Sequence, residues 1–165
     1  MPPYILSPTV NEAAAIYVLI VYFILTPLSI IIGIAGIITT GILHSRTTPK
    51  NNLYLILTEA ALSLILLINI YFCAYFIILI ATDVKKQDSN IKYYSIVYIV
   101  LDIIACAVGI GALSIRPSDL SRNNDRRLND AVFGLLCTMV VIQGICLFGQ
   151  FISVLNDFEI IQIWT

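Results

Sequence analysis

The chain has 165 residues, of which 59% are hydrophobic and only 12% are charged, and its formal net charge at pH 7 is −1. Soluble domains usually carry about 25% charged residues, and a small soluble fold leaves too much surface exposed to hide this amount of apolar side chain. The composition therefore excludes a soluble globular domain, and the near-neutral charge argues against nucleic-acid binding, which needs a basic face.

Four apolar segments are each long enough to cross a bilayer as a helix, which takes about 20 residues. In chain order they are Ala15–Leu43, Leu53–Ala81, Tyr93–Ile115 and Ala131–Leu155. Polar stretches separate them, and we expect Asn129 or Asp130 to cap the fourth helix. No basic region precedes the first segment, so we expect it to act as an uncleaved signal-anchor. The sequence thus predicts an all-α integral membrane protein, a single four-transmembrane-helix bundle over residues 1–165 with short loops.

The charges of the polar stretches predict an orientation. The stretches after the first and third segments hold six basic residues, namely Arg46, Lys50, Arg116, Arg122, Arg126 and Arg127. The stretch after the second segment holds three, namely Lys85, Lys86 and Lys92. Because basic loops tend to stay in the cytoplasm, we expect a multi-pass protein with both termini on the non-cytoplasmic side. The sequence does not identify the membrane.

Two acids, Glu59 and Asp102, lie inside the apolar segments, and no Lys or Arg lies in any of them. An acid at membrane depth is costly and needs a proton, a polar partner or another subunit. The helical rise puts Asp102 about 20 Å from the cytoplasmic end of its segment, but Glu59 only about 9 Å from the end of its own. We therefore treat the two acids separately, and we expect Glu59 to form an interfacial ion pair with Arg46 or Lys50.

Three further polar residues lie at nearly the same depth as Asp102. The helical rise places Asn69 at about 24 Å, Gln143 at about 18 Å and Thr26 at about 25 Å. Three interpretations of Asp102 follow. It is a proton or cation site, with Asn69 and Gln143 as coordinating or relay groups, or it is a protonated acid that donates a hydrogen bond to Asn69 or Gln143. In the third interpretation it pairs with a basic residue from another chain. The sequence leaves these three interpretations open.

Small residues line one face of two of the segments. Gly33 and Gly36 share a face of the first segment, and Gly109 lies on the face of the third segment that carries Asp102. Small residues let membrane helices approach closely, so we expect tight packing at these faces. Within the first segment, Pro27 predicts a kink.

No combination of residues typical of a catalytic site occurs in the sequence. The single histidine, His44, has no Cys or acid at the spacing of a metal site, and no phosphate-binding loop or nucleophile motif is present. We therefore expect no enzyme, metal or cofactor, and we expect the bilayer and other membrane subunits, or a second copy, as partners. Our leading hypothesis is a non-enzymatic protein that acts by lateral association, as an accessory or structural subunit or as a homo-oligomer. The alternative is a small oligomeric transporter or channel that uses Asp102.

Overall fold

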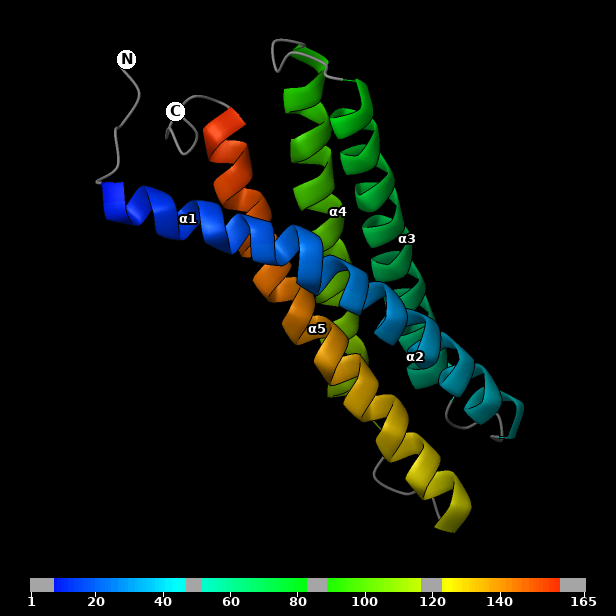
Figure 1. The fold of residues 1–165 in the computed structure, drawn as a ribbon. Helices are drawn as coiled ribbons and strands as arrows, with labels where there is room; N and C mark the ends of the chain where they lie inside the picture. Colours follow the sequence, from blue (N-terminus) through cyan, green and yellow to red (C-terminus); the bar gives the residue numbers. More distant parts are fainter. Residues whose placement is uncertain (1–7, 47–51, 83–88, 117–122, 158–165) are drawn as a thin grey trace.

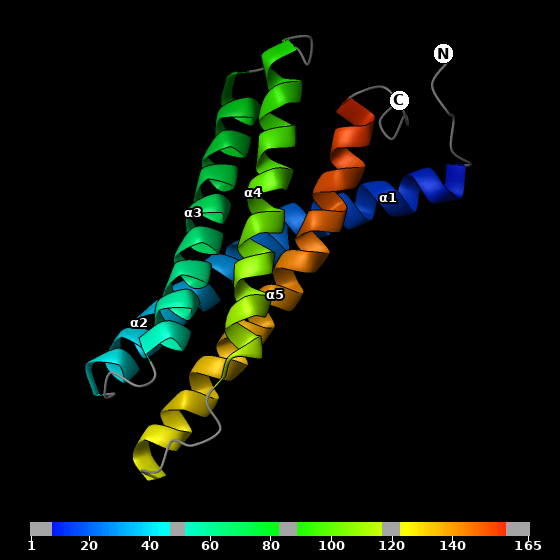
Figure 2. The ribbon, with the colours of Figure 1, turned by 180° about the vertical axis from the view of Figure 1, so that it is seen from behind.

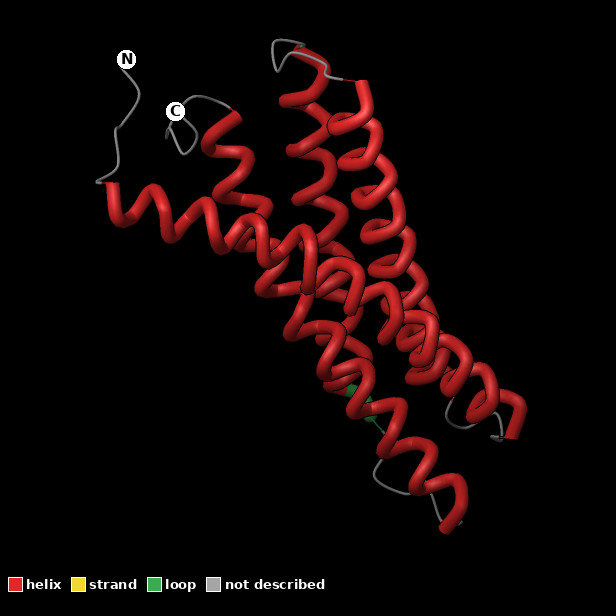
Figure 3. Tube along the Cα trace, viewed as in Figure 1, coloured by secondary structure: helices red, strands yellow, loops and turns green. Residues whose placement is uncertain are grey.

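The computed structural model describes residues 8–46, 52–82, 89–116 and 123–157, and almost all of these residues are helical (Figures 1 and 3). The elements are α1 (Pro8–Ile20), the π-helix η1 (Val21–Leu25), α2 (Thr26–Arg46), α3 (Asn52–Thr82), α4 (Ser89–Ser114) and α5 (Asn123–Asp157). The first three elements run on without a break. The described residues contain four helices long and apolar enough to cross a membrane, which confirms that part of the predicted fold class.

The helices pack in a ring in the order α2, α3, α4, α5. Both α2 and α4 pack against α3 and α5, and the view from behind shows α4 between α3 and α5 (Figure 2). Successive helices run in opposite directions (Figure 1). The end of α2, the start of α3, the end of α4 and the start of α5 therefore lie at one end of the bundle, which carries Arg46, Arg116, Arg126 and Arg127.

Helix α5 begins earlier than the apolar pattern predicts. It starts at Asn123, so Asn129 and Asp130 lie inside the helix and do not cap it. The reason is that a polar segment without Pro or Gly can extend a helix beyond its apolar part. The extension is also held by contacts. Arg116, after the end of α4, forms an ion pair with Asp130, and its guanidinium lies 4.1 Å from the centre of the Phe133 ring.

The first helix bends at the predicted position, between α1 and α2 (Figure 1). Pro27 has no N–H to donate to the carbonyl four residues before it. The backbone N–H of Thr26 instead bonds to the Val21 carbonyl, five residues back, which is the hydrogen-bond pattern of a π-helix. The Thr26 hydroxyl donates to the same carbonyl at 2.9 Å. Beyond the bend, α1 packs against α5, and the Tyr17 hydroxyl donates to the Ile145 carbonyl at 2.6 Å.

The apolar core runs along the whole bundle. Its central cluster consists of Ala61, Leu62, Ile65, Ile68, Tyr98, Ala105, Ala112, Leu136 and Met139. Smaller clusters lie toward the two ends, around Leu43 and Tyr54 at one end and around Val21 and Cys146 at the other. Many Ile, Leu, Val and Phe side chains are exposed on the outside of the bundle. An outer surface this apolar suits lipid and not water.

Candidate functional site

Asp102 lies in the seam between α4 and α5 and is completely buried. Its Oδ1 accepts a hydrogen bond of 2.6 Å from Nε2 of Gln143, which α5 supplies. Ala105 and Gly109 follow Asp102 on the same buried face of α4. These small residues allow α4 and α5 to approach closely, so the carboxyl group meets a protein side chain and not lipid.

A chain of hydrogen bonds continues from Gln143 through all the helices of the ring. Asn69 on α3 donates from Nδ2 to Gln143 Oε1 at 2.9 Å and to the Ser29 hydroxyl on α2, also at 2.9 Å. The Ser29 hydroxyl in turn points at the sulfur of Met139, 3.8 Å away. Ser29, Asn69, Gln143 and Asp102 therefore join α2, α3, α5 and α4 in the middle of the core, and we call these residues the polar chain.

A backbone carbonyl fixes the direction of the polar chain. The Nδ2 group of Asn69 also donates to the Ile65 carbonyl at 2.8 Å, and a carbonyl can only accept. The Asn69 amide is thereby oriented with its nitrogen toward Gln143, which must present its oxygen to Asn69 and its nitrogen to Asp102. The two hydrogen bonds that lead from Asn69 through Gln143 therefore both point toward Asp102, whose Oδ1 is the final acceptor.

The structure brings together three of the four residues predicted at the bilayer centre. Asn69, Gln143 and Asp102 are in one chain of hydrogen bonds, whereas the Thr26 hydroxyl bonds to its own helix. Ser29 on α2 is the fourth residue of the polar chain. The sequence contains a signal for Ser29, because it lies one helical turn after Thr26 on the same buried face of α2.

Glu59 has a different partner from the one expected. Its Oε1 lies 3.1 Å from Nδ1 of His44 at the end of α2, and Arg46 is not its partner. Lys50, the other expected partner, lies outside the described residues. The pair is partly exposed, with 39% of the His44 side chain and 34% of the Glu59 side chain accessible. Glu59 is therefore separate from the polar chain, as its shallow depth suggested.

The predicted glycines pack within the bundle itself. A Cβ atom on Gly36 would lie 3.0 Å from Leu62, and one on Gly33 would lie 3.2 Å from Met139. A Cβ on Gly109 would lie only 2.7 Å from Val140. Gly149, which the sequence did not single out, is equally tight, at 2.8 Å from Val21. These glycine faces are therefore buried in contacts between helices of the same chain.

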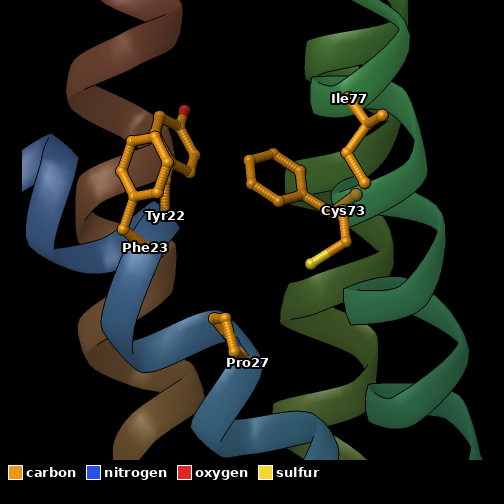
Figure 4. Close-up of a pocket in the computed structure, with 6 residues that line it drawn as sticks. Tyr22, Phe23, Pro27, Cys73 and Ile77 are labelled. Atoms are coloured by element: carbon orange, nitrogen blue, oxygen red, sulfur yellow. The ribbon is translucent and has the colours of Figure 1, made fainter.

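A cavity of about 170 Å³ opens between the bend of the first helix and α3 (Figure 4). We call it the crevice; its lining residues are Tyr22, Phe23, Pro27, Phe72, Cys73 and Ile77. The Tyr22 and Phe72 rings stack at 4.8 Å, and Phe72 also contacts Tyr98 at 5.1 Å. The bend at Pro27 turns α1 toward α5 and away from α3, which leaves the crevice uncovered.

Among the described residues, no group of three or more His, Cys, Asp and Glu side chains could hold a metal ion. The four cysteines, Cys73, Cys106, Cys137 and Cys146, are free thiols. In comparisons with known proteins, no family model, no curated protein and no solved structure matches this chain.

Proposed function

We propose that this chain is a non-enzymatic, multi-pass membrane protein that acts by lateral association in the bilayer, as a homo-oligomer or as an accessory subunit of a larger assembly. Its four long apolar helices support a location in a membrane. The basic residues at one end of the bundle, among them Arg116 and Arg126, support an orientation with that end in the cytoplasm and both termini on the opposite side.

The glycine faces and Asp102 are both occupied by contacts within the chain. The glycine faces are filled by Leu62, Met139 and Val140, and Asp102 has an amide partner within its own chain. Neither feature requires a partner subunit. The crevice is the feature that supports association, because its apolar lining is open to the outside of the bundle.

A second copy of this chain is the occupant that we assign to the crevice. An apolar cavity of about 150 Å³ can hold a benzene molecule, so a cavity of about 170 Å³ has room for a branched aliphatic side chain. The chain carries suitable side chains on the outer face of α2, where Ile31, Ile34 and Ile38 are exposed at helical spacing. In a two-fold dimer the same surface serves both copies, and α2 of one copy would pack along the crevice of the other.

Energy transfer between labelled copies in lipid vesicles tests this proposal. Donor- and acceptor-labelled protein is mixed at several protein-to-lipid ratios. Cys73→Phe fills the crevice, and we expect it to weaken association by about tenfold or more. Leu67→Phe is the matched control, because Leu67 is 64% exposed on the same helix and does not line the crevice. Helicity and the unfolding midpoint are measured for both variants.

The outcomes separate the occupants of the crevice. One outcome is that the wild type shows no more energy transfer than random mixing of labelled copies would give. That result would mean that lipid covers the crevice and that the homo-oligomer does not exist. Association that Cys73→Phe leaves unchanged, or that both variants weaken equally, would mean that the contact lies elsewhere.

One observation favours the alternative, a small transporter or channel that uses Asp102. The Oδ2 atom of Asp102 is buried and has no hydrogen-bond partner among the described residues, and intramembrane acids often mark ion pathways. Asp102→Asn separates the two functions. A transporter should lose proton or cation flux in vesicles and keep its assembly, whereas a protein that acts by association should keep its assembly and have no flux to lose.

A further inference from the structure

The side-chain nitrogen of Asn69 has more acceptors around it than it has hydrogens. Its Nδ2 atom lies 2.8 Å from the Ile65 carbonyl, 2.9 Å from the Ser29 hydroxyl and 2.9 Å from Oε1 of Gln143. An amide nitrogen carries only two hydrogens. Two hydrogens therefore serve three buried acceptors, and two of the acceptors must compete for one hydrogen.

The competition falls between Ser29 and Gln143. The Ile65 carbonyl belongs to the backbone of α3, one turn before Asn69, and it cannot leave its own helix. Ser29 and Gln143 are side chains on two other helices, α2 and α5, and the Asn69 amide turns about a soft torsion. The hydrogen that Ile65 does not hold can therefore go to α2 or to α5, and each of these bonds strengthens as the other weakens.

The donor that Asp102 receives depends on this choice. When the hydrogen goes to Gln143, Asn69 holds the Gln143 oxygen, and the Gln143 nitrogen is directed at Oδ1 of Asp102 at 2.6 Å. When the hydrogen goes to Ser29, Gln143 loses the bond that fixes its amide, and Asp102 loses a firmly oriented donor. The polar chain thus has two arrangements, and any contact that favours one of them shifts the populations.

The crevice lies beside the bond between Asn69 and Ser29. Its lining includes Pro27, two residues before Ser29 on α2, and Phe72 and Cys73, which follow Asn69 by about one turn on α3 (Figure 4). A group that fills the crevice pushes against α2 and α3 next to this bond. It therefore lengthens the distance between Ser29 and Asn69.

We propose that Asn69 is a switch that links the crevice to Asp102. A filled crevice separates α2 from α3, weakens the bond to Ser29 and directs the hydrogen to Gln143, which then holds Asp102 more firmly. The link is reciprocal, so loss of the bond between Gln143 and Asp102 favours the arrangement with Ser29. This inference adds regulation to the crevice of the proposed function, but it does not depend on which group fills the crevice or on association of two copies.

NMR spectroscopy of the full chain, at one chain per detergent micelle and with ¹⁵N-labelled Asn and Gln, tests the proposal. Ser29→Ala removes one competitor. We expect one side-chain hydrogen of Asn69 to move downfield, because it is then bonded to Gln143 at all times, and we expect the Gln143 amide signals to move as well. Cys73→Leu fills part of the crevice without adding an aromatic ring, and it should move the same signals in the same direction. Leu67→Ile is the control, because Leu67 is exposed on the same helix and does not line the crevice.

A double-mutant cycle measures the competition independently. Ser29→Ala should raise the unfolding equilibrium constant by less than about twofold in the wild type, because Gln143 takes the hydrogen. In the Gln143→Met background, where the hydrogen has only Ser29 as acceptor, the same change should raise it by about fivefold. Thr40→Ala is the matched control. The Thr40 hydroxyl is buried on α2 and bonds within its own helix, so its loss should have the same effect in both backgrounds.

Three results would overturn the proposal. Equal effects of Ser29→Ala in both backgrounds mean that the two bonds use separate hydrogens. Asn69 signals that Ser29→Ala leaves unchanged mean that Ser29 does not compete, and this measurement decides the question even if Gln143→Met does not fold. Signals that move in Ser29→Ala but not in Cys73→Leu mean that the crevice is not linked to the switch.

Discussion

Gln143 donates its side-chain amide to Asp102 across the α4–α5 seam at 2.6 Å, and the direction of this bond is fixed two helices away, where Asn69 bonds to the Ile65 carbonyl. The Ile65 carbonyl on α3 thus determines that Gln143 presents its side-chain nitrogen, and not its oxygen, to Asp102 on α4. The acid therefore acts as an acceptor at Oδ1. The sequence-based interpretation with a protonated Asp102 that donates to Asn69 or Gln143 is wrong in direction, since Gln143 is the donor.

Asn69 is the residue whose loss should disturb the polar chain most, because it donates to both Ser29 and Gln143. We expect Asn69→Leu to lower the free energy of unfolding by about 1–2 kcal/mol, since the Gln143 oxygen is left buried without a donor. Thr138→Ala is the control. The Thr138 hydroxyl is exposed and bonds only within its own helix, so its loss should cost less than about 0.5 kcal/mol. Unfolding in mixed detergent micelles measures both values, and equal costs would contradict the proposed importance of the polar chain.

Gly109 should not tolerate a side chain unless its neighbour becomes smaller. A Cβ atom there would lie 2.7 Å from Val140 Cγ2, so we expect Gly109→Ala to destabilise the bundle by about 1–2 kcal/mol. Adding Val140→Ala should recover part of this loss, and a double-mutant cycle measures the coupling. Gly144→Ala is the matched control, because nothing lies within 4 Å of its Cβ position. A cycle without coupling would show that α4 and α5 do not meet at Gly109.

The pair of Glu59 and His44 should contribute little to stability. Both side chains are partly exposed, and such pairs are usually worth less than about 1 kcal/mol. We expect Glu59→Gln to change the free energy of unfolding by no more than that, and to leave the energy transfer between labelled copies unchanged. A loss of several kcal/mol would mean that Glu59 has a buried role that its position does not suggest.

Arg116 joins the end of α4 to α5 through two contacts, the ion pair with Asp130 and the packing on the Phe133 ring. Arg116→Ala should lower the free energy of unfolding by about 1 kcal/mol. Arg116→Lys keeps the charge but loses the planar stacking group, so we expect an intermediate value. If Arg116→Lys were as destabilising as Arg116→Ala, the geometry of the guanidinium and not its charge would hold the helix ends together.

The partners of individual side chains could be predicted only in part. Asn69, Gln143 and Asp102 were found at one depth because rise along a helix depends on residue number alone. Thr26 was placed at a similar depth but does not join the polar chain, because its hydroxyl bonds to the Val21 carbonyl of its own helix. Ser29, which does join the polar chain, was not predicted at that depth. Glu59 was given a basic partner from the adjoining loop, but the bundle brings His44 to it.

The sequence by itself determined that the described chain forms four long apolar helices, because a helix that crosses a membrane must satisfy its own backbone hydrogen bonds and be apolar over its length, and both requirements are local. Only the tertiary structure decided which faces meet, since that depends on the order and tilt of helices distant in sequence. It filled the glycine faces from within one chain, opened the crevice beside Pro27, and left one oxygen of Asp102 without a hydrogen-bond partner among the described residues. These contacts, and not the composition, carry the proposals about function.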